Sequence, residues 1–128
     1  MKLKLAALAI GLIAAPWMAV AATFEQSLAK LAPEERAHEA CALKGLETMR
    51  KDARLRKADR VKSSTLQRAS LKGTTLVAKE GAVRAGKHWY ALSFTCQLSP
   101  DFMKAQSFTF QLGAEIPKEQ WEKLELWG

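Results

Sequence analysis

Two cysteines and two histidines are the side chains of this 128-residue chain best suited to nucleophilic, redox or metal chemistry. Cys41 and Cys96 lie far apart in the sequence, which excludes the C-x-x-C spacing of thiol oxidoreductases. No serine stands in a G-x-S-x-G setting, and no glycine-rich loop leads into the Gly-Lys-Ser/Thr that cradles phosphate. The common nucleophile and nucleotide-binding motifs are therefore absent from the sequence.

The two histidines lack the partners that a catalytic or metal site requires. His38 follows Glu34 by four residues, a helical spacing that suits two metal ligands, but no third ligand is recognisable. A solvated helix face explains His38 better, and His88, close after Gly86, suits the edge of a strand. We therefore predict no catalytic residue, no metal and no cofactor, and a protein that is not an enzyme.

A high local density of basic residues is the most distinctive feature of the sequence. Nine basic residues fall between positions 50 and 72, opposed by only two aspartates. On a helix, Arg50, Arg54 and Lys57 share one face at i, i+4 and i+7, and such a basic stripe attracts anions. The alternative is a solvated helix end whose cations suit the helix dipole. The predicted anion- or partner-binding residues are Arg50, Arg54, Lys57, Arg60 and Lys62.

Trp89 is a further candidate contact. Its side chain points to the opposite face of a predicted strand from those of Tyr90 and Phe94. Trp89 is therefore exposed if only one face of the sheet is covered. An exposed tryptophan can contact a partner or a sugar ring. The alternative is that a terminal helix covers it, through Trp121 or Trp127.

The N-terminus has the three parts of a secretory signal peptide. Lys2 and Lys4 open it, residues 5–20 carry no charge, and small residues end it. We predict an exported protein that is cleaved after Ala22 or Ala21. The alternative, an uncleaved transmembrane anchor, would be short, because its apolar run of about 16 residues falls below the roughly 20 that span a bilayer. No cysteine stands near the cut, so a lipoprotein signal is excluded.

Removal of residues 1–22 leaves about 106 residues, which suits one small domain over residues 23–128. Loss of the two lysines in the signal lowers the net charge from +7 to +5. In an oxidising compartment two cysteines most simply form a disulfide, Cys41–Cys96, and the alternative is two separate buried thiols. Export also argues against nucleic acid, the usual partner of a basic patch.

Hydrophobic periodicity predicts the elements that would position these residues. Proline and two acids predict a helix from Pro33 to residue 53, with Cys41 bordering its apolar side. The clearest strand is 88–98, where every second side chain belongs to one mainly apolar face. Cys96 lies on that apolar face. We predict weaker strands at 60–66, 74–78, 82–84 and 107–112, turns at 79–81 and 85–87, and a short helix from residue 116.

The predicted fold class is α+β. An N-terminal helix is disulfide-linked to an antiparallel sheet of three to five strands, with a short C-terminal helix. Two independent patterns agree in this prediction. The helix periodicity directs Cys41 toward the body of the domain, and the strand alternation directs Cys96 toward the side where a helix would pack.

Several blocks of the sequence resemble one bacterial family. They are residues 40–46, 52–61, 89–96 and 107–110, with Gly113 and Ile116-Pro117. Together they are similar to the domain of unknown function numbered 930, found in exported proteins of alphaproteobacteria, and the likeness extends over residues 32–127. The resemblance implies a Gram-negative periplasm as the destination, and it assigns no catalytic or binding residue.

Charge and destination together suggest a function. We expect a non-enzymatic periplasmic binding or accessory protein that engages an anionic envelope component, or an envelope protein, through the basic stripe. The anions of a periplasm include phospholipid head groups, lipopolysaccharide phosphates and acidic wall polymers. The alternative is an inhibitor or regulator of an envelope enzyme such as a cell-wall hydrolase, by analogy with other small disulfide-bonded exported domains.

Overall fold

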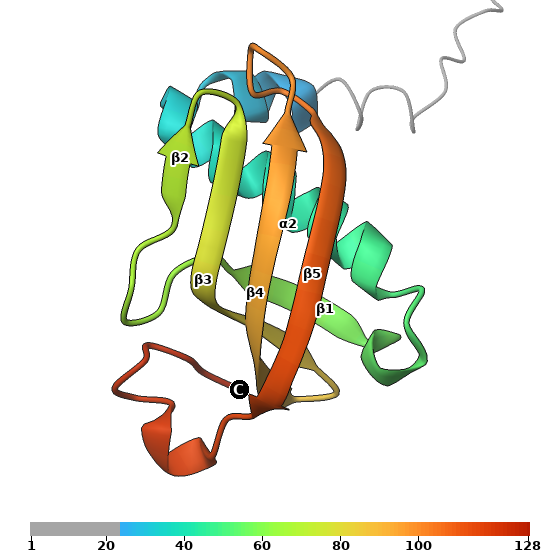
Figure 1. The fold of residues 1–128 in the computed structure, drawn as a ribbon, viewed down its shortest axis with the longest axis vertical. Coiled ribbons are helices and arrows are strands. Elements are labelled where there is room, and N and C mark those ends of the chain that lie inside the picture. The colour runs from blue at the N-terminus through green and yellow to red at the C-terminus, as the bar shows by residue number, and fades with distance from the viewer. Residues whose placement is uncertain (1–23) are drawn as a thin grey trace, which may run out of the picture.

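A helix lies across a five-stranded antiparallel sheet in the computed structural model, which describes residues 24–128 (Figure 1). The predicted signal segment, residues 1–22, lies outside the described residues. The strand order is β1-β3-β4-β5, and β2 also pairs with β3. The predicted α+β class is confirmed. The strands are β1 (Ala58–Lys62), β2 (Ser70–Lys72), β3 (Thr75–Ala85), β4 (His88–Leu98) and β5 (Ala105–Glu115).

Helix α2 (Pro33–Met49) packs on the sheet mainly through small side chains. Its proline lies in the first turn, where a missing N–H costs nothing, and two glutamates beside it suit the helix dipole. At Gly45 a Cβ atom would lie 2.7 Å from the ring of Phe108, so glycine is required for this close approach. The buried residues of the helix are Ala37, Ala40, Cys41, Gly45 and Met49.

The helix ends earlier than predicted. It stops at Met49 rather than at residue 53, and a separate 3₁₀ helix, η1 (Ala53–Leu55), follows it. The carboxylate of Asp52 accepts a hydrogen bond from the backbone N–H of Arg54 at 2.9 Å and caps this second helix. The cap starts a new turn in a new direction, which ends the longer helix.

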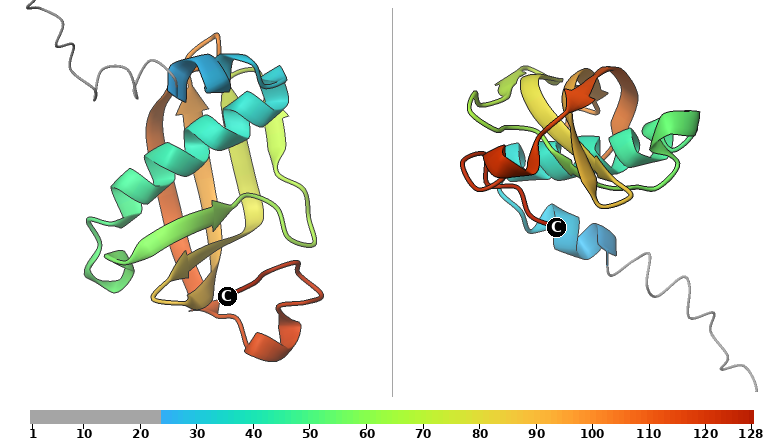
Figure 2. Two further views of the ribbon diagram at one scale, coloured as in Figure 1. Left: turned by 180° about the vertical axis from the view of Figure 1, so that it is seen from behind. Right: turned by 90° about the horizontal axis from the view of Figure 1, so that it is seen from below.

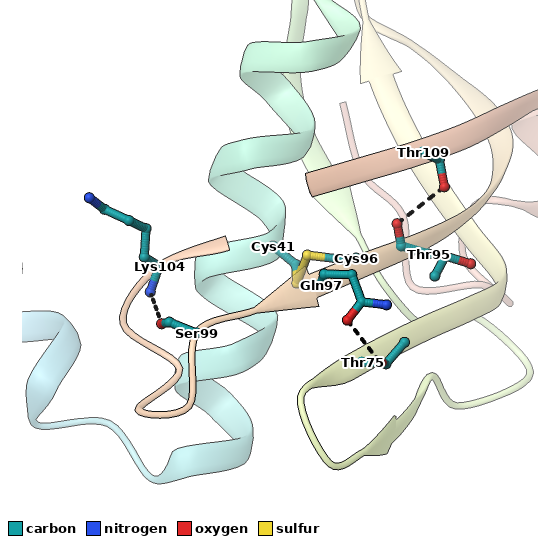
Figure 3. The surroundings of a disulfide bond; sticks show 8 residues. All are labelled: Cys41, Thr75, Thr95, Cys96, Gln97, Ser99, Lys104 and Thr109. Atoms are coloured by element: carbon teal, nitrogen blue, oxygen red, sulfur yellow. Dashed lines mark hydrogen bonds between the residues drawn. A yellow bond between two sulfur atoms is a disulfide. The ribbon is translucent and has the colours of Figure 1, made fainter. Parts of the chain in front are cut away.

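A disulfide joins α2 to the sheet, as predicted. Cys41 and Cys96 are fully buried and bonded, with their Cα atoms 6.1 Å apart. Figure 3 shows the bond between the helix and β4, with side-chain hydrogen bonds along the neighbouring strands. The bond spans a sequence separation of 55 residues, so it restrains a large part of the unfolded chain.

Strand β3 is one long strand where the sequence predicted two short ones. The predicted turn at 79–81 is wrong, because the chain passes through this stretch in a bulge between Ala78 and Gly81. The two halves of the strand pair with different partners, β2 and β1. At Gly81 a Cβ atom would lie 2.8 Å from the carbonyl oxygen of Lys62, so glycine is needed at the bulge.

Strand β4 has the predicted bounds, and every second side chain from Leu92 to Leu98 is buried. The predicted turn at 85–87 is confirmed, since Gly86 and Lys87 have φ angles of 61° and 70°, as a tight hairpin requires. The other strands differ from their predicted limits. β1 starts and ends before the predicted 60–66, β2 was not predicted, and β5 extends beyond 107–112 at both ends.

The chain after β5 folds back at one end of the sheet (Figure 2). It contains the 3₁₀ helix η2 (Lys118–Gln120), where the sequence predicted a short helix. Within residues 24–128, no helix is long and apolar enough to cross a membrane. The segment builds a second, small apolar cluster, whose buried members are Ala82, Trp89, Ile116 and Leu126.

Candidate functional site

The basic residues predicted to form a stripe do not share a helix face. Arg50 follows the last residue of α2, Arg54 lies in η1, and Lys57 lies in the turn before β1. The predicted i, i+4, i+7 alignment is therefore wrong, because the helix that would produce it ends at Met49. The structure distributes these side chains over three short elements.

Two of these arginines are engaged within the fold. Arg50 donates from Nε to the carbonyl oxygen of Ala58 at 2.7 Å, which ties the end of α2 to β1. Arg54 donates to both carboxylate oxygens of Asp52, at 3.0 and 2.7 Å. These hydrogen bonds lower the pKa of Asp52 to about 2, so at neutral pH the carboxylate is charged and offsets the guanidinium.

Further cations lie on the segment around η1, in β1 and in the hairpin between β3 and β4. Asp59, the other aspartate of this stretch, accepts hydrogen bonds from Arg84 at 2.9 and 3.0 Å, which lower its pKa. Both local acids are thus already paired. In this region, five exposed cations make no ion pair within the described residues. They are Lys51, Arg56, Lys57, Arg60 and Lys87, and we call this surface the basic end.

An open hollow lies within the basic end. Its volume is about 280 Å³, and it is bounded on one side by η1 and the turn after it, and on the other by the hairpin. Guanidinium and ammonium groups on its rim can bind a phosphate or carboxylate group by charge-assisted hydrogen bonds. The lining residues are Ala53, Arg54, Arg56, Lys57, Ala85 and Gly86.

Lys62, also predicted as a binding residue, is engaged within the fold instead. Its ammonium group donates to the carbonyl oxygens of Glu125 at 2.8 Å and Leu124 at 3.4 Å. The carboxylate of Glu125 lies 3.8 Å away and further offsets its charge. Lys62 therefore anchors the C-terminal segment to β1.

Trp89 is not an exposed contact, so that interpretation is wrong. The side chain is 0 % exposed, because the C-terminal segment folds over it. Its indole N–H donates to the carbonyl oxygen of Trp127 at 2.8 Å, and the two rings meet edge to face. The alternative interpretation is confirmed in part, because Trp127 covers Trp89 but lies after η2 in a segment that is not helical.

Trp127 is the site residue that sequence reasoning missed. It is 49 % exposed and lies beside β1. The Arg60 guanidinium lies 5.4 Å and the Lys62 ammonium 5.5 Å from the centre of its ring, within the range of cation–π attraction. The aromatic composition of the C-terminus was the available signal, but the cationic surroundings depend on how that segment folds back.

Comparison of the sequence with known families agrees with the resemblance drawn above. The family model described as Domain of Unknown Function (DUF930) matches residues 28–126. The chain belongs to this family. No curated protein and no solved structure matches the chain. The matched range contains α2, all five strands and every cation of the basic end, and it ends one residue before Trp127.

The sheet of this DUF930 domain has a second face, which α2 does not cover (Figure 1). Hydroxyl and amide side chains lie in register there, with Thr95 opposite Thr109 and Ser93 opposite Gln111. Bulges in β3 and between β4 and β5 adjoin a cleft of about 410 Å³, which we call the sheet-face cleft. Its walls outside the sheet include Leu66, Ile116 and Leu124.

The histidines of the DUF930 domain do not belong to the basic end. His38, on α2, is half-buried near Glu34 and Arg68, and this burial lowers its pKa. His88 lies with Nδ1 2.8 Å from a carboxylate oxygen of Glu115. Within the part of the chain that the structure describes, no three His, Cys, Asp or Glu side chains gather as a metal-binding group.

Proposed function

We propose that this protein is a non-enzymatic binding or accessory protein of the bacterial cell envelope, and that its basic end holds an anionic envelope component. The observation that supports the proposal is an excess of unpaired positive charge at the basic end. Both nearby aspartates are bonded to arginines, while five cations remain exposed. Such a surface concentrates anions and speeds their encounter with the protein.

The choice of anion follows from the proposed destination. The signal-like residues 1–22 support export, and the periplasm contains phospholipid head groups, lipopolysaccharide phosphates and acidic wall polymers. Within the basic end, Arg56 and Lys57 border the hollow and make no ion pair in the described structure, so we expect them to contribute most. Arg54 should contribute less, because Asp52 already offsets its charge.

Co-sedimentation with purified sacculi and outer-membrane vesicles tests this function. The protein is used from Thr23 onward, the form that the proposed signal cleavage after Ala22 would leave. We expect pelleting at low salt that is lost at high salt, since exposed charges are screened by salt. The double variant Arg56→Glu/Lys57→Glu should no longer pellet.

The matched control is Lys72→Glu/Lys79→Glu, which makes the same change in net charge on β2 and β3. It should pellet nearly as well as the unmodified protein. Absence of pelleting at low salt, or equal losses in the two double variants, would contradict a binding role for the basic end.

A second candidate function is regulation of an envelope enzyme through a protein–protein contact. One observation favours it: the sheet-face cleft has Leu66, which is 62 % exposed, in its wall. Exposed apolar side chains beside a cleft are typical of protein contacts. Binding of this kind should resist salt and should weaken in Leu66→Asp, while the double variant of the basic end leaves it intact.

A further inference from the structure

We propose that the basic end docks on a bilayer surface containing anionic lipids, and that the indole of Trp127 enters the interfacial layer of that bilayer. This inference rests on the proposed function and names the anionic ligand as a lipid surface. The observation that carries it is a half-exposed tryptophan beside two cationic side chains.

The apolar ring of Trp127 lies beside two cationic side chains. Arg60 and Lys62 are two residues apart on β1, so both side chains leave the same face of the strand, and both reach the ring. Tryptophan is enriched at the boundary between lipid and water, where its ring is buried and its N–H stays near polar groups. Basic side chains at the same depth are attracted to anionic head groups.

The position of the ring is set by hydrogen bonds to its own backbone. The carbonyl oxygen of Trp127 accepts from the Trp89 indole at 2.8 Å and from the Arg84 guanidinium at 3.3 Å. One residue earlier, Leu126 donates its N–H to the carbonyl oxygen of Trp121 at 2.8 Å. Because the backbone is already ordered, insertion of the ring would cost little additional conformational entropy.

The backbone segments that carry the cations and Trp127 lie on one side of the molecule (Figure 2). Figure 2 shows the C-terminus beside β1, on the side of the sheet that α2 covers, and the turn containing η1 lies along the same side. A broad anionic surface can therefore contact Trp127 and cations such as Lys57 together. A soluble polyanion would use the cations alone, since it offers no apolar layer for an exposed indole.

Vesicle binding by the chain from Thr23 onward tests the inference. We expect binding to vesicles of phosphatidylcholine mixed with phosphatidylglycerol, and none to pure phosphatidylcholine. Trp127→Ala should weaken vesicle binding about tenfold, as expected for loss of part of one buried aromatic side chain. Its affinity for dextran sulfate, a soluble polyanion, should change less than about twofold. The control Leu66→Ala removes a more exposed apolar side chain elsewhere and should leave vesicle binding unchanged.

Fluorescence gives a readout that does not depend on affinity. After residue 22 the chain has Trp89, Trp121 and Trp127, and the first of these is fully buried. Phosphatidylglycerol with brominated acyl chains should quench the emission of the unmodified protein. In Trp127→Phe, which keeps an aromatic ring at the site, this quenching should largely disappear while binding remains.

The outcomes separate the inference from the proposed function. Vesicle binding unaffected by Trp127→Ala, or unmodified protein that binds dextran sulfate but not anionic vesicles, overturns the bilayer inference and leaves an anion-binding function standing. The inference is also overturned if Trp127→Ala weakens binding to vesicles and to dextran sulfate equally. The ring would then only support the shape of the basic end. If the unmodified protein binds neither probe at low salt, the proposed function itself fails.

Discussion

The two apolar clusters of the molecule are held together in different ways. The main cluster, between α2 and the sheet, has fifteen buried residues and contains the Cys41–Cys96 disulfide. The C-terminal cluster has four buried residues and is attached by hydrogen bonds that Lys62, Arg84 and Trp89 donate to backbone carbonyls. The attachment of the C-terminal segment rests on few contacts, so we expect a single substitution to release it while the rest of the domain stays folded.

This difference divides the proposed site between the two clusters. The cations around η1 follow α2 and adjoin the main cluster through Leu55 and Ala58. Trp127 belongs to the segment that the small cluster holds in place. Electrostatic attraction and insertion of the indole are therefore supported by different parts of the fold, and they can be removed separately.

Removal of the disulfide should have the largest effect on stability. The double variant Cys41→Ala/Cys96→Ala should lose about 4 kcal/mol of unfolding free energy, because the bond closes a long loop in the unfolded chain. Urea denaturation under oxidising conditions measures this loss. The whole domain should unfold at lower denaturant, so a loss confined to residues 116–128 would contradict the assignment of the disulfide to the main cluster.

Replacement of Trp89 should release the C-terminal segment selectively. Trp89→Leu removes the ring and its hydrogen bond to Trp127, at an expected cost of about 2–4 kcal/mol. Hydrogen exchange should become fast at residues 118–128 while α2 stays protected. The matched control is Phe94→Leu, on the same strand but in the main cluster, which should weaken the whole domain instead. An identical exchange pattern in the two variants would erase the distinction between the clusters.

Replacement of Lys62 should have a smaller effect of the same kind. Lys62→Met keeps an unbranched apolar stem but removes the hydrogen bonds to Leu124 and Glu125, which should cost about 1–2 kcal/mol. The measurement is amide exchange at residues 124–126. Lys79→Met, which alters a lysine in the β3 bulge, should leave these amides unchanged. Unchanged exchange in Lys62→Met would show that the small cluster does not need this anchor.

The smallest of these effects should be the contribution of His38 to the pH dependence of the free energy of unfolding. Burial lowers the pKa of His38 below its usual 6.5, although the carboxylates of Glu34 and Glu39 oppose this and Arg68 adds to it. The unfolded chain therefore binds a proton before the folded one does, so stability is lost as the pH falls from about 6.5 through the lower folded pKa. His38→Gln should lack this part of the pH dependence of urea unfolding. If the stability of His38→Gln and that of the unmodified protein change equally with pH, His38 does not contribute to the pH dependence.

Local patterns were sufficient to predict the part of the fold around the disulfide. Alternation along residues 88–98 predicted both limits of β4, and helical periodicity placed Cys41 on the side facing it. These signals are reliable because each depends on neighbours within a few residues. The limits of β1 and β5 were less accurate, since pairing with adjacent strands extends or shortens a strand.

The candidate site was predicted only in part, because its geometry depends on contacts between distant segments. The basic composition after Arg50 was visible, but a single cap at Asp52 ends the alignment of those side chains. The burial of Trp89 depends on a segment almost forty residues later in the chain, which the sequence could offer only as an alternative. Sequence reasoning therefore predicted which residues carry the charge but not how they are arranged.

Residue-resolved mapping of an anionic lipid on the protein tests directly whether the basic end is the binding site. We would record amide NMR spectra of the chain from Thr23 onward during titration with dihexanoyl phosphatidylglycerol below its micellar concentration. We expect chemical-shift changes concentrated at residues 51–62, at residues 85–88 and at Trp127, and we expect them to be lost in Arg56→Glu/Lys57→Glu. Shifts concentrated at the sheet-face cleft, or spread evenly over the surface, would contradict the claim that the basic end is the binding site.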